Sequence, residues 1–242
     1  MGQAIEASSD WAEVVDPEEE QRHQAFADTI VALQTKINAK SGEGRGFHRK
    51  QIAGLRGEFT VLKHDAPELA KGLFAEPRTL PCLVRMSNGA ITEQADVVPD
   101  IRGLAISVRD VDGRGALLKR TDRQDFLLIH RSSFGFTDSR GFAEVVEAAA
   151  GGQIGLAKAM VKEHGAIGGP VELAKLSRDL LRPFGSFATA TFFSSAPIQY
   201  GPYAVRVRAT PVDQPFNPLA ASLVTIRFAS GVRTIRPISC AM

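Results

Sequence analysis

The stretch that decides the fold lies between residues 45 and 108, where four short segments follow one another: RGFHRK (45–50), GEFTVL (57–62), VRMSNG (84–89) and DIRGLAISV (100–108). The last three are apolar or alternate apolar with polar residues, and Gly, Pro or Asp bound them, which is typical of β-strands. An Arg inside an apolar strand, as at position 85, is unusual because Arg is rarely buried without a partner. The stretch therefore predicts β-structure that carries functional side chains.

The residues before this stretch predict an arm and one helix. Residues 1–16 are polar and are expected to form an N-terminal arm. Asp16 suits a helix N-cap, Pro17 suits the first helical position, and acidic residues fill the first turn. Apolar residues then recur at helical spacing up to the Gly-rich break at 41–44, which predicts an amphipathic helix over 17–39. These apolar residues are Phe26, Ile30, Leu33 and Ile37.

The rest of the chain alternates between strand-like and helical sequence. Strands are predicted at 55–63, 80–87, 101–109, 125–130, 189–194 and 203–211, with a short helix at 66–74 and a hairpin over 222–236. An Ala-rich segment at 139–181, broken by glycine pairs, predicts two or three helices. This order predicts an α+β chain built on an antiparallel barrel that helices interrupt. The periodicity alone leaves a sandwich or an open sheet as alternatives.

Composition excludes several classes of protein. The net charge of +2 over 242 residues, without a run of Lys or Arg, gives no indication of nucleic-acid binding. Cys82 and Cys240 form neither a disulfide framework nor a zinc pattern. The first residues do not resemble a signal peptide, and no apolar run approaches the roughly 20 residues that span a bilayer. The expected location is the cytoplasm, where free thiols are ordinary.

The motifs together resemble the haem-dependent catalase superfamily, and especially its small bacterial catalase-related members. SSAPIQYGPY (194–203) matches the family pattern Ser-x-x-Pro-x-x-Tyr-Gly-x-Tyr, and DIRGLA (100–105) is similar to a strand signature of the family. The resemblance implies a closed eight-stranded antiparallel barrel with a helical excursion between its halves. It therefore suggests a haem-barrel domain over 17–212, with 213–242 as an atypical tail or hairpin.

The resemblance also implies a set of site residues. His48 matches the distal His that moves a proton between the two oxygen atoms of peroxide, a task that suits imidazole near neutral pH. Arg45 and Arg85 match residues that pair with haem propionates, which the guanidinium fork binds bidentately. Ser87 matches a Ser beside the distal His, and Phe134 matches the aromatic residue that stacks on the distal side of the haem.

The next motifs have a structural role or depart from the family. In DIRGLA, Gly103 is expected to permit close backbone approach, and Asp100 and Arg102 are expected to pair locally. Catalases carry a distal Asn at the head of the following strand, but residues 121–129 contain none. Asp122 or Gln124 is the polar residue expected nearest to that place, although an ionised Asp cannot donate a hydrogen bond as an amide does.

The proximal side of the implied haem site has no counterpart in the sequence. The family ligand is a Tyr on a late helix, four residues after an Arg, and its tyrosinate holds the iron ferric. Tyr200 and Tyr203 are the two tyrosines of the chain, and neither follows an Arg at that spacing. No spacing recommends a histidine as the ligand instead. Three further histidines are each expected on the surface or in a loop: His64, His130 and His164.

The sequence is compatible with three functions. The first is a haem protein that degrades hydrogen peroxide or uses organic peroxides. The second is a truncated or degenerate barrel without haem or activity, which binds an apolar ligand or nothing. The third is a partner-binding domain whose helical segment 139–181 docks another subunit, for example in a homo-oligomer. The resemblance ends near Val212, which indicates a truncation or frameshift, or else a natural short form whose 222–236 hairpin completes the barrel.

Overall fold

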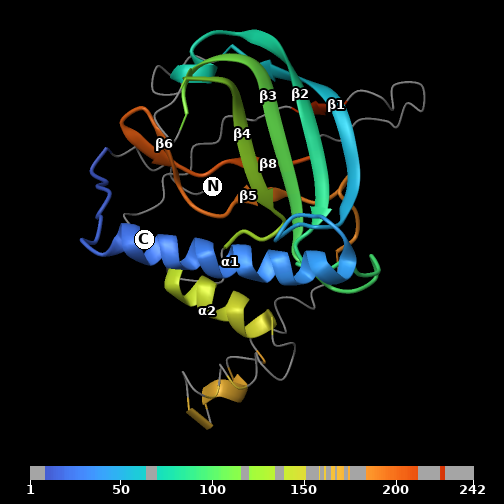
Figure 1. The fold of residues 1–242 in the computed structure, drawn as a ribbon. Helices are drawn as coiled ribbons and strands as arrows, with labels where there is room; N and C mark the ends of the chain where they lie inside the picture. Colours follow the sequence, from blue (N-terminus) through green and yellow to red (C-terminus); the bar gives the residue numbers. More distant parts are fainter. Residues whose placement is uncertain are drawn as a thin grey trace.

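One curled, mainly antiparallel sheet forms the body of the molecule, and two helices lie across one end of it (Figure 1). We describe the fold from a computed structural model. It describes residues 9–63, 70–115, 120–133, 139–150, 184–211 and 224–226, and single helical positions between 158 and 174. Phe134, His64 and His164 lie outside the described residues.

The described elements follow one another in an order that places most strands beside their sequence neighbours. They are α1 (Glu19–Ser41), β1 (Gln51–Val61), the 3-10 turn η2 (Gly72–Phe74), β2 (Arg78–Asn88), β3 (Arg102–Arg114), β4 (Arg120–Ile129), α2 (Ser139–Ala150), β5 (Phe192–Ser194), β6 (Ile198–Tyr200), β7 (Tyr203–Val205), β8 (Arg208–Ala209) and β9 (Val224–Ile226). Seven strands pair in the order β8-β5-β4-β3-β2-β1-β9, and β6 pairs with β7 as a separate hairpin.

The four central strands confirm the strand predictions and extend them. β1 to β4 are each longer than predicted, because main-chain pairing continues beyond the alternating apolar residues, as at residues 120–124 in β4. The strand predicted at 203–211 is instead two strands, β7 and β8. Arg206 leaves the ladder between them and donates to the carbonyl oxygens of Ser194 and Ser132. The hairpin strand β6 was not predicted.

The sheet is a curled half-barrel, which is the part of the barrel prediction that the structure supports. Among the described strands, β8 and β9 are the edges and no pairing joins them. β9 pairs with β1 in parallel, with Gly57 opposite Val224 and Phe59 opposite Ile226. The hairpin predicted over 222–236 is therefore seen only as one strand on the β1 edge, since residues 227–236 lie outside the described part.

The helices agree with the sequence in part. The cap predicted at Asp16 is wrong by two residues, because α1 begins at Glu19 and its N-cap is Glu18, which makes no side-chain capping bond. Asp16 lies in the turn before the helix, where its side chain accepts a hydrogen bond from the Glu18 N–H and its carbonyl oxygen accepts one from the Glu19 N–H, each at 2.9 Å. The helix predicted at 66–74 is wrong in the described part, which contains only η2. α2 begins where the helical segment 139–181 was predicted and buries Ala143 and Val146.

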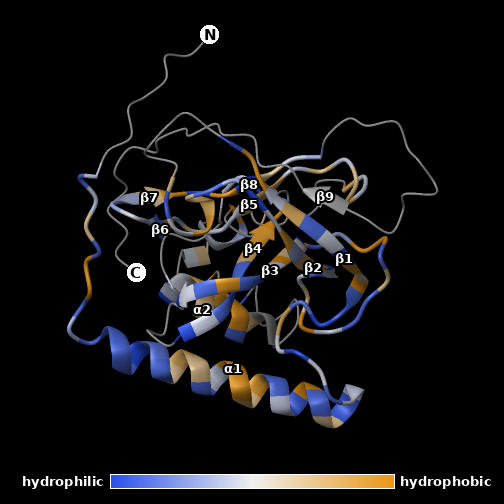
Figure 2. Cartoon of the chain, turned by 90° about the horizontal axis from the view of Figure 1, so that it is seen from above, coloured by the Kyte–Doolittle hydropathy of each residue, from blue (hydrophilic) through white to orange (hydrophobic). Residues whose placement is uncertain are grey.

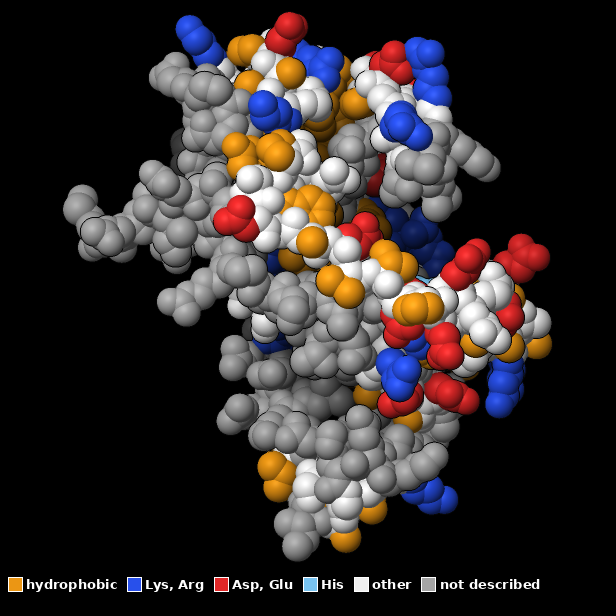
Figure 3. All heavy atoms as spheres, turned by 90° about the vertical axis from the view of Figure 1, so that its left-hand side faces the viewer, with side chains coloured by type: hydrophobic (Ala, Val, Ile, Leu, Met, Phe, Trp, Pro, Cys, Tyr) orange, Lys and Arg blue, Asp and Glu red, His pale blue; other side chains and the backbone are white. Residues whose placement is uncertain are grey.

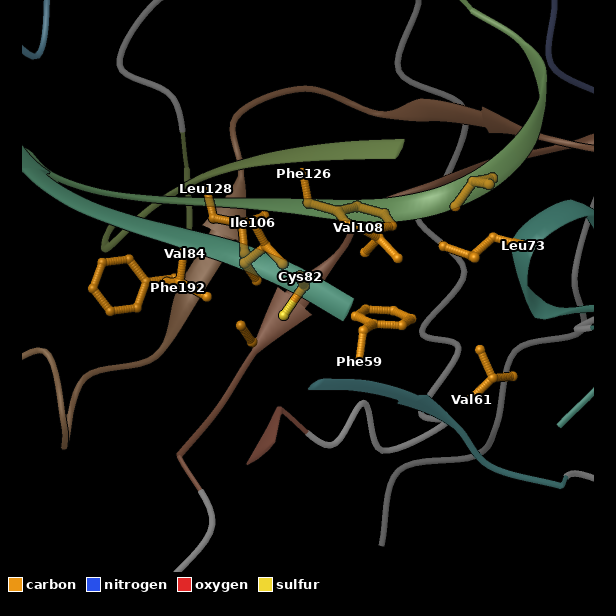
Figure 4. Packing of buried hydrophobic residues seen from close by; sticks show 12 residues of the cluster. Phe59, Val61, Leu73, Cys82, Val84, Ile106, Val108, Phe126, Leu128 and Phe192 are labelled. Atoms are coloured by element: carbon orange, nitrogen blue, oxygen red, sulfur yellow. The ribbon is translucent and has the colours of Figure 1, made fainter. Parts of the chain in front are cut away.

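The core lies on the concave face of the half-barrel, where alternate residues of each strand point inward (Figure 4). Phe59 of β1 stacks on Phe126 of β4 with ring centroids 5.9 Å apart. Figure 2 shows apolar residues on the strands and a largely hydrophilic α1. The core consists of Phe59, Val61, Leu73, Cys82, Val84, Ile106, Val108, Val111, Phe126, Leu128, Phe192 and Ala209.

The arm and the surface complete the description. Trp11 in the arm donates from Nε1 to the carbonyl oxygen of Pro202 at 2.8 Å, so the arm reaches the β6–β7 hairpin. On the face drawn in Figure 3, acidic and basic side chains lie interspersed instead of forming a field of one sign. None of the helices in the described part combines the length and apolar character that crossing a membrane requires.

Candidate functional site

The site begins at His48, in the connection between α1 and β1. His48 has a φ of 51°, in the left-handed region that non-glycine residues rarely adopt. Main-chain hydrogen bonds hold it there, because its N–H donates to Gly89 at 3.1 Å and the next N–H, of Arg49, donates to Ala90 at 3.3 Å. The connection is thus joined to the end of β2. Such conformations persist only where the surroundings enforce them.

The imidazole of His48 is held against β2 and β3. Its Nδ1 lies 3.0 Å from the Oγ of Ser87, and Ser87 is buried. The ring lies directly on Gly103, where an added Cβ would come within 2.5 Å of the ring carbon Cε1. Glycine at this position therefore leaves the space that the imidazole fills, as expected from the sequence. Since Ser87 occupies Nδ1, Nε2 is the ring nitrogen left to meet a ligand.

The surroundings of His48 favour the neutral imidazole. Burial lowers the pKa of His48, and the positive charge of Arg85 lowers it further. Asp100 opposes this effect, and Arg45 adds a smaller lowering. A neutral ring near pH 7 has one nitrogen that can accept a proton, which is the state that a general base requires.

Arg45 and Arg85 lie near each other and near His48. Arg85 is half-buried and donates from Nη2 to the carbonyl oxygen of His48 at 2.5 Å. Burial lowers its pKa and the charge of Arg45 adds to the effect, so the two guanidinium groups are close enough to repel. Within the described residues, no carboxylate lies within ion-pair distance of Arg45 or Arg85. Positive charge is therefore available for an anionic group beside the imidazole.

The strands beside His48 present an outer face, opposite the core, that is mostly small or apolar. Pairing places two rows across it: Gly54, Arg85, Ala105 and Leu127 form one, and Gln51, Ser87, Gly103 and Ile129 form the other. The side chain of Leu127 is 71% exposed although it is apolar. Three residues in these rows are Gly or Ala, and the His48 ring lies over Gly103 while the side chain of Gln51 lies near Gly54.

This register corrects the expectation for the position of the distal Asn. Asp122 and Gln124 are exposed near the start of β4, where Gln124 pairs with Val108, well away from Ser87. The β4 residue in the row of Ser87 and Gly103 is Ile129, which is apolar. The prediction was wrong because it followed polarity and did not use the pairing of β3 with β4, which places the end of β4 beside the start of β3.

Arg102 and Asp100 do not pair with each other, in contrast to the prediction. Arg102 is buried and donates to the side-chain oxygen of Asn88 and to two carbonyls in the loop 96–98. Asp100 accepts a hydrogen bond from the Ala90 N–H at 2.9 Å. Each side chain therefore fixes the connection between β2 and β3. That connection also supplies the main-chain partners of His48 and Arg49.

His130 lies in the bend that follows β4, which agrees with the loop position expected from the sequence, and its side chain is half-buried there. Its Nδ1 accepts a hydrogen bond from the Arg102 N–H at 2.9 Å, and its ring packs edge to face on Phe184 with centroids 5.2 Å apart. Its Nε2 is buried, and no hydrogen-bond partner for it is found among the described residues. Burial is the first cause that lowers the pKa of His130 to about 4, followed by the charge of Arg131. His130 is therefore neutral and belongs to the packed end of the half-barrel.

Tyr200 lies beside the core, and Tyr203 pairs with it across the β6–β7 hairpin. The ring of Tyr200 packs on Phe74 with centroids 5.7 Å apart, and Phe74 in turn packs on Phe59. Burial raises the pKa of Tyr200, and a hydrogen bond to the main chain of Lys71 opposes the shift. In the described part of the chain, no three His, Cys, Asp or Glu side chains are grouped so as to hold a metal ion.

Comparisons with known proteins show a likeness in fold alone. No family model matches the chain, and no curated protein does. A fungal catalase matches at a TM-score of 0.51 and 14% identity, over 91% of this chain and 44% of the catalase. A bacterial catalase matches at 0.47 and 17%, over 86% of this chain and 38% of the other. The chain thus spans less than half the length of these two catalases, and its fold is catalase-like.

Proposed function

We propose that this chain holds haem against the outer face of β1–β4 and acts on peroxide there, with His48 as the group that accepts and returns a proton. The observation that carries the proposal is the imidazole of His48, neutral and half-buried, held by Ser87 over Gly103. The likeness in fold to the fungal catalase supports it. Hydrogen peroxide or an organic hydroperoxide is the substrate class.

The described residues fit one face of haem. Ala105 is small, Gly103 lets the imidazole of His48 lie close to the strands, and Leu127 offers an exposed apolar contact. Arg45 and Arg85 have no carboxylate partner within the described part and would hold the propionates, since guanidinium binds carboxylates strongly. Bound haem would supply the redox chemistry that cleaves the O–O bond.

The chemistry of the chain itself is a proton transfer. Nδ1 of His48 is bonded to Ser87, so Nε2 would take the proton from one peroxide oxygen and return it to the other, which leaves as water. The lowered pKa of His48 keeps this nitrogen free at neutral pH. Ile129 beside the site offers no hydrogen bond to the peroxide, so His48 would carry this task without an amide partner.

One observation favours a second candidate function, a catalase-like half-barrel that binds a ligand without peroxide chemistry. Tyr200 packs on Phe74 beside the core, and therefore does not stand with His48 as a residue that could hold haem iron. An apolar, carboxylated ligand would satisfy the same arginines and the same exposed Leu127.

Haem titration and peroxide turnover together test both candidates. We expect the wild-type chain to bind haem stoichiometrically with a Soret band, and His48→Gln to reduce peroxide turnover by about 10²–10⁴-fold, the usual contribution of a positioned acid–base group. Arg120→Met, on the exposed tip of the β3–β4 hairpin, is the control and should behave as wild type. Haem binding without turnover would favour the second candidate, and no haem binding at all would contradict the proposal.

A further inference from the structure

Arg49, the residue after His48, is buried in an unusual way. Its side chain is only 8% exposed, and none of its described bonds goes to a carboxylate. A buried guanidinium without an opposite charge needs another source of compensation. The partners that it has are therefore informative about its role.

The partners of Arg49 are the last residues of α1 and the turn that follows. Nη1 donates to the Oδ1 of Asn38 at 2.8 Å and to the carbonyl oxygen of Arg45 at 3.4 Å. Nη2 donates to the carbonyl oxygens of Ser41, at 3.4 Å, and Gly42. The end of a helix leaves carbonyl groups unpaired and carries partial negative charge. Arg49 supplies both the donors and the positive charge that this end requires.

The turn is shaped around this guanidinium. Gly42 has a φ of 77°, and an added Cβ on Gly44 would come within 2.5 Å of the guanidinium carbon. Gln34 of α1 donates to the carbonyl oxygen of Gly44 at 2.7 Å, which holds the turn from the helix side. Residues 42–45 are thus packed between α1 and Arg49, and no larger residue fits at 44 without displacing the guanidinium.

We propose that Arg49 positions His48 by clamping the end of α1 and the turn 42–45, which fixes the backbone where His48 takes its left-handed conformation. The side chain acts one residue away from the imidazole and does not touch the outer face, so it is a positioning residue. The inference rests on the proposed function only where it concerns proton transfer by His48. The positioning of His48 by Arg49 does not depend on whether His48 transfers a proton.

Substitutions that keep or remove the charge test the proposal. Arg49→Lys keeps a positive charge but cannot reach four acceptors, Arg49→Met removes the charge, and Asn38→Ala removes one acceptor. The readouts are the titration of the His48 ring by NMR and the hydrogen exchange of its N–H. We expect both Arg49 variants to raise the His48 pKa towards its ordinary value. We also expect exchange about tenfold faster or more, with a smaller change in Asn38→Ala, since charged hydrogen bonds are lost.

The Lys variant separates position from charge. Removing a nearby positive charge raises the pKa of a His by itself, so a shift in Arg49→Met alone, with none in Arg49→Lys, would overturn the proposal. The amides of Ile106 and Val108 in the core should keep their exchange rates. If they accelerate equally in both Arg49 variants, Gly44→Ala decides, because it displaces the guanidinium without removing it; an unchanged His48 in that variant overturns the proposal.

The test also separates this inference from the proposed function. Unchanged titration and exchange of His48 in Arg49→Lys would overturn the positioning role whatever the peroxide assay gives. A changed His48 in Arg49→Lys, with full turnover in His48→Gln, would keep the positioning role and contradict the peroxide chemistry.

Discussion

The two faces of the sheet formed by β1–β4 differ in the interactions that their side chains make. On the concave face, Ile106 and Val108 are completely buried and Phe59 stacks on Phe126. On the outer face, one residue along the chain from the buried Leu128, Leu127 is 71% exposed. The core depends on apolar contact, whereas the site at His48 depends on main-chain hydrogen bonds and on one glycine. The packed core and the candidate site therefore lie on opposite faces of one sheet, and mutations should separate their effects.

The largest expected difference between the faces is in stability. Leu128→Ala should lower the free energy of unfolding by about 2–5 kcal/mol, because it removes a buried side chain and leaves a cavity. Leu127→Ala should change it by less than about 0.5 kcal/mol, as exposed substitutions do. Denaturant unfolding of both variants measures the difference. Equal losses would mean that the outer face is also packed in solution.

A second comparison sets two glycines of β3 against each other. Gly103→Ala would place a Cβ against the His48 ring and should cost about 1–3 kcal/mol. As the ring is pushed towards water, the pKa of His48 should rise towards its ordinary value. Gly113→Ala, where nothing lies within 4 Å of the added carbon, is the matched control. NMR titration of His48 with urea unfolding checks both, and an unmoved His48 in Gly103→Ala would show that the imidazole does not lie on this glycine.

The stability of the chain in acid should depend on His130, at the packed end of the concave face. His130 has a pKa of about 4 in the folded chain against the ordinary 6.5, so the unfolded chain binds a proton first as the pH falls. Its contribution is complete above pH 6.5 and is lost progressively from there to about pH 4. His130→Gln should flatten the stability profile over this interval. Thermal melts from pH 7 to pH 4 provide the measurement, and parallel profiles for the two proteins would contradict the burial of His130.

The smallest effect is expected where neither face is involved. Arg120 and Asp112 form an ion pair of 2.7 Å at the far end of β3 and β4, and both side chains are largely exposed. Asp112→Ala should cost about 0.2–1 kcal/mol or less, and the effect should vanish in high salt. Unfolding at two salt concentrations is the check. A larger cost would mean that this end of the hairpin contributes to the fold as the core does.

The sequence predicted the core face of the sheet better than the outer face. Alternation in β1–β4 records burial directly, so the strands and most of the core could be found from it. The proximity of His48, Ser87 and Gly103 depends on strand register, which spacing along the chain does not reveal. The same lack of register information explains why the sequence did not place Ile129 beside Ser87 and Gly103. Arg49 carried a weak signal, since it follows a helix and a Gly-rich turn, but its bonds to the helix end required the fold.

The parallel pairing of β9 with β1 was the other miss, and its cause is distance along the chain. Local pattern predicts a hairpin wherever two alternating runs flank a Ser-Gly turn, as around 230 and 231. The pairing of Gly57 with Val224 joins residues far apart in sequence, which no window of neighbouring residues contains. The edge that β9 covers would otherwise present unpaired main-chain groups.

The single tryptophan of the chain gives a convenient optical consequence. Trp11 lies in the arm, and its indole N–H donates to the carbonyl oxygen of Pro202 in the β6–β7 hairpin. Its emission therefore reports whether the arm is docked, not whether the sheet is folded. A fluorescence change that precedes the loss of circular dichroism during denaturation would time the release of the arm as a separate event.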